Sequence, residues 1–463
     1  MNRREFLALS GLTSAKLAWK AATPFTAISE VGSSNADIVL RIAPVTLELA
    51  PDTVIKTVGY NGTAPGPILR MHEGKRVTVD IYNGTDVPEL VHWHGQLVSS
   101  GVDGAEEEGT PFVLPRGRRR FTFTPQPAGT RWYHTHAMSD GNLERGTFTG
   151  QFGFLYIEPK TEPGNYDQEI FLAAHHWQPS LAHKGPGNNG WEVAYGACSI
   201  NDKALGHGEP IRVKLGERML FRFLNASATE DIRLALPGHQ FKVIALDGNP
   251  VPSPQIVEVL QLAVAERIDA VVEMNRPGVW ILGSTNDEDR NTGMGVVVEY
   301  AGRQGEPQWI APAKVPWDYT SRTPWDYTIF GSESPAVPQP DGRFDLTFGK
   351  IPGERVTFNR WTINGKQYPE ADPLLVKAGK RYRLSFNNDT GDSHPLHLHR
   401  HNFELTKYNG KPTAGILKDI VNVPGRTNNT EVDFVANNPG PSLFHCHMQL
   451  HMDFGFKTLV KYV

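Results

Sequence analysis

The chain has 463 residues, a formal net charge of −4 and 39% hydrophobic residues. This length allows roughly two to four domains, and the weak negative charge argues against nucleic acid as a partner. The 45 glycines and 35 prolines, set between alternating Val, Ile, Thr and Phe, predict an all-β chain with many turns. No apolar run of about 18 or more residues occurs, so we expect no membrane-spanning helix.

The N-terminus, residues 1–27, has the pattern of a bacterial export signal. Arg3-Arg4 precede a short, mildly apolar run that ends near Ala15 and is followed by small residues. A basic flank before such a run resembles the twin-arginine type of signal, and an arginine pair on a frayed terminus is the alternative. We therefore expect the twin-arginine export machinery as a partner and a periplasmic or extracellular location.

Three segments of the chain repeat one pattern. In each, a strand precedes a Gly turn, an arginine follows two residues after the glycine, and a second strand ends at Asn83, Asn225 or Asn387. The copies lie further apart than the roughly 20–50 residues of a solenoid repeat, which indicates duplication of a whole domain. We expect three domains, at residues 28–160, 161–305 and 343–463, with a linker at residues 306–342 before the last of them. A doubled Pro-Trp-Asp-Tyr-Thr segment at 316–320 and 324–328 should pack its aromatic side chains on the neighbouring domains.

The first and third domains each carry two His-x-His pairs at matching distances from the repeat. The four pairs are His92/His94, His134/His136, His397/His399 and His445/His447. In a strand, residues two apart share a face, so each pair can hold neighbouring metal ions. At the matching positions the middle domain has Leu234, Leu236, Gly283 and Thr285. We expect the middle domain either to be structural or to shape the approach of the substrate.

The last histidine pair brackets a cysteine, Cys446. Successive side chains of a strand point to opposite faces, so Cys446 and its two histidine neighbours can serve two different metal centres. Cys446 with His394 and His451 makes a set of two imidazoles and one thiolate, which is typical of a blue copper site for electron transfer. With Cys446 used as a ligand we expect no disulfide, and we expect Cys198 to be a small buried side chain.

These eleven residues resemble the four signatures of the multicopper oxidases, in the three-domain group that contains laccases and bacterial cuprous oxidases. The signatures read His92-Trp93-His94-Gly95, Trp132-Tyr133-His134-Thr135-His136, His394-Pro395-Leu396-His397-Leu398-His399 and His445-Cys446-His447-(x)₃-His451. The resemblance covers the whole mature chain. It implies three cupredoxin-like Greek-key β-sandwiches and four copper ions: one type 1, and a cluster of one type 2 and two type 3 between the first and third sandwiches.

The resemblance also implies which residue binds which copper ion. His92 and His397 would bind type 2; His94, His134 and His447 one type 3 ion; His136, His399 and His445 the other; His394, Cys446 and His451 type 1. It implies one-electron oxidation of a small-molecule donor at type 1, relay of the electron through Cys446, and four-electron reduction of O₂ to water.

No cluster of methionines occurs in the chain, and thioethers suit Cu(I). We therefore favour a laccase-like enzyme acting on phenols or aromatic amines.

Other functions stay open. A cuprous or ferrous ion oxidase for metal tolerance is the main alternative, and a non-enzymatic scaffold of the same fold is the weaker one, since relatives of that kind have lost ligands. A two-domain copper nitrite reductase is disfavoured because its catalytic copper needs only three histidines.

Two positions of the sequence depart from the family pattern. The axial position ten residues after the cysteine holds Phe456, which cannot coordinate, so type 1 should be trigonal with a raised potential. Met452, nearer in sequence, is expected to pack.

Oxygen reduction consumes protons, so carboxyl groups near the cluster matter. Asp103 stands where the family places an acid beside type 2, and a turn aspartate that caps backbone amides is the alternative. The glutamate that several bacterial relatives carry after the last histidine is replaced here by methionine, which leaves Asp453 as a weak candidate. We expect Glu106-Glu107-Glu108 to be a solvated loop.

The remaining histidines are expected to be non-ligands at surfaces, in turns or in strands: His72, His175, His176, His183, His207, His239 and His401.

Overall fold

The computed structural model describes residues 35–161, 164–182, 190–312, 326–333, 337–353, 357–427 and 429–463. The expected export signal, His183 and residues 316–325 of the doubled segment lie outside this part of the chain. Asp37–Val463 form one unit, whose described residues are mostly strands and loops. None of the short helices in the described residues is long and apolar enough to cross a membrane. The all-β class is confirmed.

The first sandwich packs two four-stranded sheets, in the orders β2-β1-β4-β6 and β3-β8-β7-β5. Ile42 and Val79 from one sheet and Trp93 and Tyr133 from the other share a single buried core, because each strand turns alternate side chains inward. The strands are β1 (Ile38–Ala50), β2 (Thr53–Tyr60), β3 (Leu69–His72), β4 (Val77–Asn83), β5 (Val91–His94), β6 (Arg118–Phe123), β7 (Gly129–Thr135) and β8 (Phe152–Glu158).

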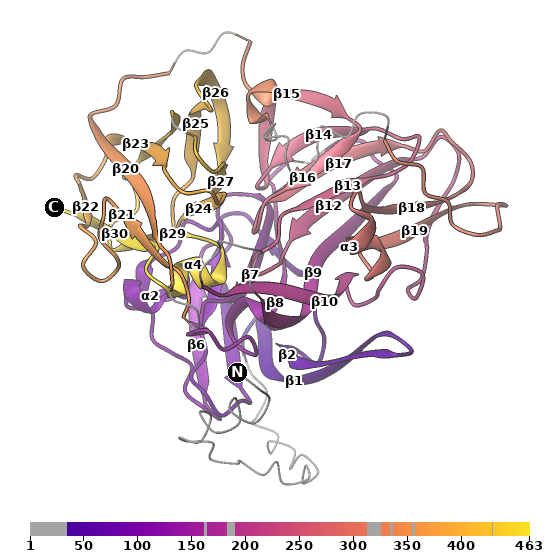
Figure 1. The fold of residues 1–463 in the computed structure, drawn as a ribbon, viewed down its shortest axis with the longest axis horizontal. Helices are drawn as coiled ribbons and strands as arrows, with labels where there is room; N and C mark the ends of the chain where they lie inside the picture. The colour runs from indigo at the N-terminus through magenta and orange to yellow at the C-terminus, as the bar shows by residue number, and fades with distance from the viewer. Residues whose placement is uncertain are drawn as a thin grey trace, which may run out of the picture. The chain divides into compact units, whose positions relative to one another are not determined.

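The second sandwich has sheets in the orders β10-β9-β12-β17-β14-β15 and β11-β19-β18-β13-β16. These strands carry the magenta to red part of the ribbon in Figure 1. Their bounds are β9 (Gln168–Ala182), β10 (Glu192–Ile200), β11 (Ile211–Val213), β12 (Arg218–Asn225), β13 (Ile232–Ala235), β14 (Phe241–Leu246), β15 (Asn249–Val257), β16 (Val259–Leu262), β17 (Arg267–Glu273), β18 (Val279–Ser284) and β19 (Gly295–Tyr300), with helix α3 at Asp287–Asn291.

The third sandwich, orange to yellow in Figure 1, repeats this topology with the orders β21-β20-β23-β28-β25-β26 and β22-β30-β29-β24-β27. The bounds are β20 (Gly342–Ile351), β21 (Arg360–Ile363), β22 (Leu374–Val376), β23 (Arg381–Asn388), β24 (His394–Leu398), β25 (Phe403–Tyr408), β26 (Lys411–Lys418), β27 (Ile420–Val423), β28 (Thr430–Val435), β29 (Ser442–Cys446) and β30 (Lys457–Tyr462). The short helices outside the second sandwich are α2 (Ser100–Asp103), η1 (Glu106–Glu108), η2 (Gly146–Phe148), η3 (Tyr327–Phe330) and α4 (Gln449–Asp453).

The asparagine that ends each repeat has one structural role. The side chains of Asn83, Asn225 and Asn388 are fully buried, and each amide donates to carbonyl oxygens of the loop and strand that follow. The third equivalent is therefore Asn388, and Asn387 was wrong by one residue. The correction removes the extra residue that the comparison of the repeats needed before the third pair of histidines.

The strand register also corrects the middle domain. Ala235 lies opposite Gly283, as His92 lies opposite His134 and His397 opposite His445. Gly283 is thus the equivalent of His134 and His445, as expected. Leu234 was wrong by one residue, because the loop between Asn225 and β13 is one residue longer, and Ala235 is the equivalent of His92. The conclusion that the middle domain has lost its histidine ligands is unaffected, since these positions hold no histidine either way.

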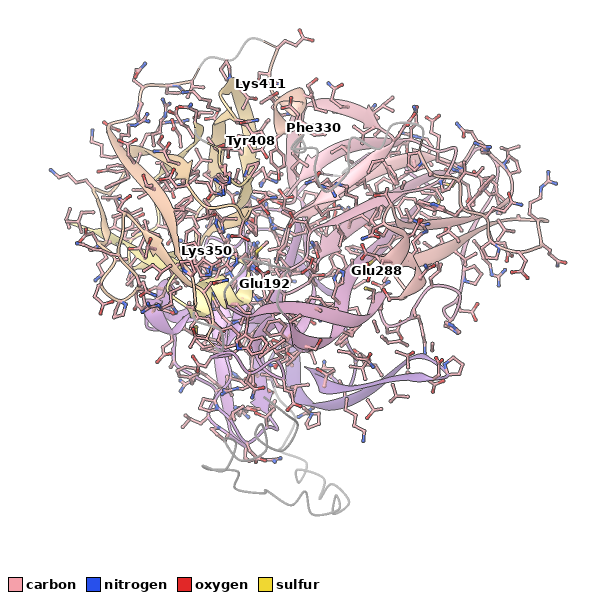
Figure 2. The ribbon with its side chains drawn as sticks, in the orientation of Figure 1. Glu192, Glu288, Phe330, Lys350, Tyr408 and Lys411 are labelled. Carbon is pink, nitrogen blue, oxygen red and sulfur yellow. The ribbon has the colours of Figure 1, made fainter. Side chains whose placement is uncertain are left out.

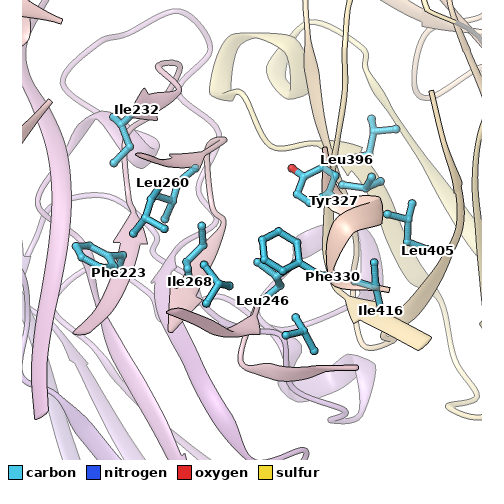
Figure 3. Close-up of a cluster of buried hydrophobic side chains, with 14 of the residues drawn as sticks. Phe223, Ile232, Leu246, Leu260, Ile268, Tyr327, Phe330, Leu396, Leu405 and Ile416 are labelled. Carbon is cyan, nitrogen blue, oxygen red and sulfur yellow. The ribbon is translucent and has the colours of Figure 1, made fainter. Parts of the chain in front are cut away.

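Helix η3 of the linker joins the second and third sandwiches. Tyr327 and Phe330 are buried in one apolar cluster with side chains from both. Figure 3 shows them between Leu246 of β14 and Ile416 of β26. The Tyr327 hydroxyl donates to Oε1 of Glu266 at 2.5 Å. The expected packing of the doubled segment therefore holds for Tyr327, and its other aromatic side chains lie outside the described residues.

Candidate metal centre

Antiparallel strand pairs bring the histidines together. His92 of β5 lies opposite His134 of β7, and His397 of β24 lies opposite His445 of β29. The second histidine of each pair follows two residues later on the same face. All eight side chains are buried: His92, His94, His134, His136, His397, His399, His445 and His447.

Each half of the cluster comes from a different sandwich. Nε2 of His92 lies 3.4 Å from Nε2 of His397, the two residues expected to bind type 2. The rings of His94 and His397 stack with centroids 3.9 Å apart, and those of His92 and His399 at 4.0 Å. Because each stack joins the first sandwich to the third, the cluster forms only where the two meet.

The two histidine sets expected at type 3 copper are also grouped. The ligand atoms of His136, His399 and His445 lie within 4.8 Å of one another. In the other set, Nδ1 of His94 lies 3.4 Å from Nε2 of His134. The third member, His447, has its ring centroid 5.1 Å from that of His134 and 5.2 Å from that of His94.

The state of these imidazoles fits metal binding. Nε2 of His136 and both ring nitrogens of His447 are buried and make no hydrogen bond among the described residues. Burial, followed by the proximity of other histidines, lowers the pKa of both side chains well below the usual value. Metal ions bind the neutral form of imidazole. Buried, neutral and unpaired donor nitrogens of this kind suit copper.

Asp103, the predicted acid, lies against two of these histidines. Its Oδ2 accepts from Nδ1 of His399 at 2.7 Å, and its backbone oxygen accepts from Nδ1 of His92 at 2.8 Å. Burial by itself acts to raise the pKa of Asp103, but His92 and His399 outweigh it and hold that pKa well below the usual range. Asp103 therefore carries a negative charge at the edge of the cluster.

A second aspartate, Asp419, was missed from the sequence. It lies between β26 and β27, and its backbone oxygen accepts from Nδ1 of His397 at 2.7 Å. Its Oδ1 accepts from Nε2 of His94 at 3.0 Å, so the nitrogen of His94 that faces the cluster is Nδ1. The only local signal was the charged pair Lys418-Asp419 between two apolar segments, which is unusual for strands that are buried.

The acidic run Glu106-Glu107-Glu108 is only in part the solvated loop that the sequence suggested, since Glu106 alone is exposed. Oε1 of Glu108, which is buried, accepts from the backbone amide of Leu443 at 2.6 Å and lies 3.3 Å from Nδ1 of His399. Burial, and then the nearby Asp103, raise the pKa of Glu108 well above its usual value. Glu107 accepts from Lys457 at 2.5 Å. The prediction failed for Glu107 and Glu108 because η1 packs on β29 of the third sandwich, a contact that local spacing does not reveal.

The third sandwich alone forms the site around Cys446. Its Sγ lies 3.7 Å from Nδ1 of His394 and 3.4 Å from Nδ1 of His451, and these nitrogens are 3.2 Å apart. The point equidistant from the three atoms is about 2.0 Å from each, close to the roughly 2.0–2.1 Å of a bond from imidazole to a first-row metal ion. Burial raises the pKa of the Cys446 thiol, so its thiolate form needs a bound cation.

Phe456 covers one side of this site with a hydrocarbon ring. It is fully buried, and its ring centroid lies 4.7 Å from that of His394. The axial position predicted from the sequence thus presents no donor atom. Met452, in α4, is also buried.

A cavity of about 680 Å³ lies between the second and third sandwiches, with His451 in its wall. The wall also holds aromatic and acidic side chains, among them Trp191, Phe358, Trp361, Glu192, Glu230, Asp231 and Asp392. Figure 2 labels Glu192 of β10 and Lys350 of β20, and Lys350 pairs with Asp392 at 3.1 Å. Burial, then the nearby Glu266, raise the pKa of Asp231 to about 7. The middle domain therefore shapes the space beside His451.

Asp453, the weak candidate, has other partners. Its Oδ2 accepts from the backbone amides of Ser139 and Asp140, both at 3.1 Å, and its Oδ1 accepts from Gln449 at 2.8 Å. None of these groups belongs to a cluster histidine. Burial raises the pKa of Asp453 to about 6. These contacts join a loop of the first sandwich to α4 of the third.

Cys198 is buried, as expected, and both cysteines are free. His72 and His207 are exposed. The buried histidines outside the cluster use a ring nitrogen for other contacts: His175 with the Ala226 carbonyl, His176 with the Ser227 hydroxyl and His401 with the Tyr462 hydroxyl. His239 lies in a turn, where its backbone amide donates to the carbonyl of Leu236, and it is buried, with the Tyr300 hydroxyl 2.6 Å from its Nε2.

The fold and the donor sets define a copper protein of cupredoxin-like sandwiches, with a mononuclear site and a histidine cluster joined by one strand. Three family models, each described as multicopper oxidase, match residues 42–162, 174–302 and 338–462. The chain belongs to the multicopper oxidases. It is a copper oxidoreductase that uses O₂, and its cofactors are four copper ions: one type 1, one type 2 and two type 3.

Named relatives cover nearly the whole chain. Multicopper oxidase MmcO of Mycobacterium tuberculosis is 29% identical, over 98% of this chain and 91% of the relative. Laccase-2 of Fomitopsis schrenkii is 26% identical, over 89% of this chain and 87% of the relative. The crystal structure of a multicopper oxidase from Pseudomonas thermotolerans is 25% identical and superimposes with a TM-score of 0.71, over 92% of this chain and 100% of that chain.

Proposed function

We propose that this multicopper oxidase is laccase-like and takes single electrons from phenols or aromatic amines. The cavity beside His451 carries this proposal. Its volume of about 680 Å³ falls within the roughly 300–1,000 Å³ of small-molecule sites. Trp191, Phe358 and Trp361 offer flat apolar surface to an aromatic ring. A donor packed there would lie against the imidazole of His451, the ligand of the mononuclear site that reaches the cavity wall.

We also propose that each copper ion takes the ligands implied by the family signatures. Type 2 takes His92 and His397; type 3 takes His94, His134 and His447 on one ion and His136, His399 and His445 on the other; type 1 takes His394, Cys446 and His451. The neutral imidazoles of His136 and His447 and the 3.2–3.7 Å triangle around Cys446 support this assignment. Phe456 in the axial position supports a trigonal type 1 site with a raised potential.

Bound copper supplies the one-electron chemistry, and the chain supplies the path between sites. Cys446 points to the mononuclear site while its neighbours His445 and His447 point into the cluster. An electron that enters at the His451 edge of the cavity therefore has a covalent path through one short stretch of backbone. Reduction of O₂ to water takes four electrons, so four donor molecules are oxidised for each O₂.

Each O₂ also takes up four protons, and we propose that Asp103 relays them with Glu108. Oδ2 of Asp103 accepts from Nδ1 of His399 at 2.7 Å, and Oε1 of Glu108 lies 3.3 Å from the same nitrogen. The raised pKa of Glu108 keeps its carboxyl group protonated, whereas the lowered pKa of Asp103 keeps it ready to accept a proton. Asp453 stays the weaker candidate, because its oxygens are engaged with loop amides and Gln449.

A cuprous or ferrous ion oxidase is the second candidate. The carboxyl groups of Glu230, Asp231 and Asp392 in the cavity wall favour a cation. Cu(I) prefers thioether ligands, and Met448 is the single methionine among the described wall residues. A non-enzymatic scaffold is no longer a candidate, because the chain belongs to a family of copper oxidoreductases and all the expected ligand residues are present.

Rates of O₂ uptake with a phenol, an aromatic amine, Cu(I) and Fe(II) separate these functions, with Cys446→Ser as the inactive control. We expect the aromatic donors to give the higher kcat/KM and metal analysis to give four copper ions. A clear preference for a metal ion would overturn the laccase-like proposal.

We propose export by the twin-arginine route, supported by the Arg3-Arg4 pattern, and hence a periplasmic or extracellular site of action. We also keep the domain limits 28–160, 161–305 and 343–463 as proposals. The paired sheets support them, since the three sandwiches take their strands from 38–158, 168–300 and 342–462.

A further inference from the structure

Arg267 begins β17 of the second sandwich, yet its guanidinium group reaches the layer of side chains around the histidine cluster. Nη1 donates to Oδ1 of Asp419 at 2.7 Å, and Nη2 donates to Oδ2 at 2.5 Å. This is a bidentate pair, the strongest geometry between a guanidinium and a carboxylate. Both side chains are fully buried. Oδ1 of Asp419 also accepts from Nε2 of His94 at 3.0 Å.

We propose that Arg267 is a positioning residue for the trinuclear copper cluster: it holds the Asp419 carboxylate in place, and Asp419 orients His94 so that Nδ1 faces the copper ions. The proposal rests on the ligand set proposed above. It gives the middle domain, which has lost every His-x-His pair, a direct part in the copper cluster.

The guanidinium group of Arg267 is itself held rigidly. Nη1 donates to the carbonyl of Ala265 at 2.9 Å, Nη2 to the carbonyl of Asp247 at 3.2 Å and Nε to the carbonyl of Thr130 at 3.3 Å. All three nitrogens therefore have fixed acceptors besides Asp419. A planar fork anchored in this way sets the plane of the carboxylate, which the single point charge of a lysine would not do.

The Asp419 carboxylate depends on these partners because it is removed from water. A buried carboxylate is tolerated when it is paired and hydrogen-bonded. Arg131 of β7 adds a hydrogen bond from its Nη1 to Oδ2 of Asp419 at 3.3 Å. Asp419 of the third sandwich is therefore bound by arginines of both the first and the second. His94 in turn depends on Asp419, because a metal-ligating histidine is fixed in ring orientation and tautomer by what its second nitrogen binds.

Gly95 shows that the backbone of the ligand strand is built around this pair. It follows His94 directly and has a φ of +82°. A Cβ atom there would lie 2.5 Å from Oδ2 of Asp419 and 3.2 Å from Nη2 of Arg267. Any side chain would displace the ion pair. The glycine of the His-x-His-Gly signature therefore makes room for a carboxylate and an arginine from the two other sandwiches.

The test compares Arg267→Met with Arg222→Met in the copper-loaded full-length protein. Arg222 of β12 is a matched control, since it is buried and donates to Thr130 of the first sandwich at 2.9 Å, but its ion pairs are with Asp269 and Glu169. Each variant is measured for copper per chain, for the blue absorption of type 1, for the electron paramagnetic resonance of type 2, and for kcat and KM with O₂ and donor.

We expect Arg267→Met to weaken copper binding at the cluster by about 10–100-fold, the usual loss when a partner of a ligating histidine is removed. The blue absorption and the donor KM should not change, because both report the type 1 site. Arg222→Met should keep the full cluster signals. If both variants keep the same cluster signals, or lose them equally, the proposal is wrong.

Arg267→Lys keeps the test decisive if Arg267→Met does not fold. It retains a positive charge and loses the fork, so we expect a weaker copper cluster at an unchanged midpoint of thermal unfolding. A lysine variant with wild-type cluster signals would overturn the proposal. Failure of the ligand set itself would be distinct, since the wild-type protein would then lack the type 2 signal and O₂ uptake.

Discussion

Two aspartates hold the histidine cluster, and they differ in what surrounds them. Asp103 and Asp419 each accept one imidazole N–H on the carboxylate and another on the backbone oxygen. Asp103 has a second carboxyl group beside it, that of Glu108. Asp419 instead has the guanidinium groups of Arg267 and Arg131. The same contact to histidine is thus placed in two opposite electrostatic surroundings.

This difference in surroundings indicates that Asp103 and Asp419 have different roles. A carboxylate hydrogen-bonded to two arginines is fixed in position, so it can orient its histidine. A carboxylate beside a protonated carboxyl group can exchange a proton with it. Oδ1 of Asp103 and Oε2 of Glu108 are both buried and make no hydrogen bond among the described residues. We assign proton transfer to the Asp103 side and anchoring to the Asp419 side.

Asp419→Asn should have the largest effect, and on stability. The variant leaves Arg267 and Arg131 buried without their anion, which costs about 3–5 kcal/mol for a buried ion pair that loses one partner. Unfolding in denaturant measures this loss, and copper content should fall with it. Asp103→Asn is the control. If both variants lost the same free energy of unfolding, the two sides would not differ as we describe.

Asp103→Asn should act on catalysis instead. The amide keeps the shape of the side chain but cannot accept a proton, so we expect kcat to fall by about 10²-fold or more. O₂ uptake at saturating donor measures kcat. The anaerobic rate at which the donor bleaches the blue absorption should be unchanged. A kcat close to that of the wild-type protein would show that protons arrive by another route.

The two carboxyl groups of the Asp103 side should give opposite pH dependence in the copper-free protein. The raised pKa of Glu108 stabilises the fold below pH 4.5, and this stabilisation is lost as the pH rises through the folded pKa. The lowered pKa of Asp103 stabilises the fold above pH 3.8, and this is lost as the pH falls. Glu108→Gln should therefore remove the loss of stability above pH 4.5, measured by denaturant unfolding at several pH values. An unchanged slope would contradict the assignment.

Asp453→Asn should have the smallest effect. Its carboxylate caps the amides of Ser139 and Asp140, so its loss should cost about 1 kcal/mol of stability and leave kcat nearly unchanged. Thermal unfolding and O₂ uptake together check this. A fall in kcat as large as that of Asp103→Asn would instead make Asp453 of α4 a proton donor, in addition to Asp103 and Glu108.

Much of the copper site was predictable because its signals are local. A spacing of two residues places both histidines of a pair on one face of a strand, and a cysteine between them faces the other way. The comparison of the repeats failed by one residue at Asn387 and at Leu234, since loop lengths differ between the sandwiches. The burial of Glu108 and the contact of Asp419 with His94 were missed. Each of these residues packs against a sandwich other than its own: Glu108 against the third and Asp419 against the first.

By itself, the sequence determined the fold class, the metal and the residues able to bind it, because strand alternation and ligand chemistry are properties of short segments. Only the tertiary structure decided what each carboxyl group does. Asp419 and Arg267 are far apart in the chain and meet only when the second and third sandwiches pack together. Their charges become decisive there because burial removes the water that would otherwise screen them.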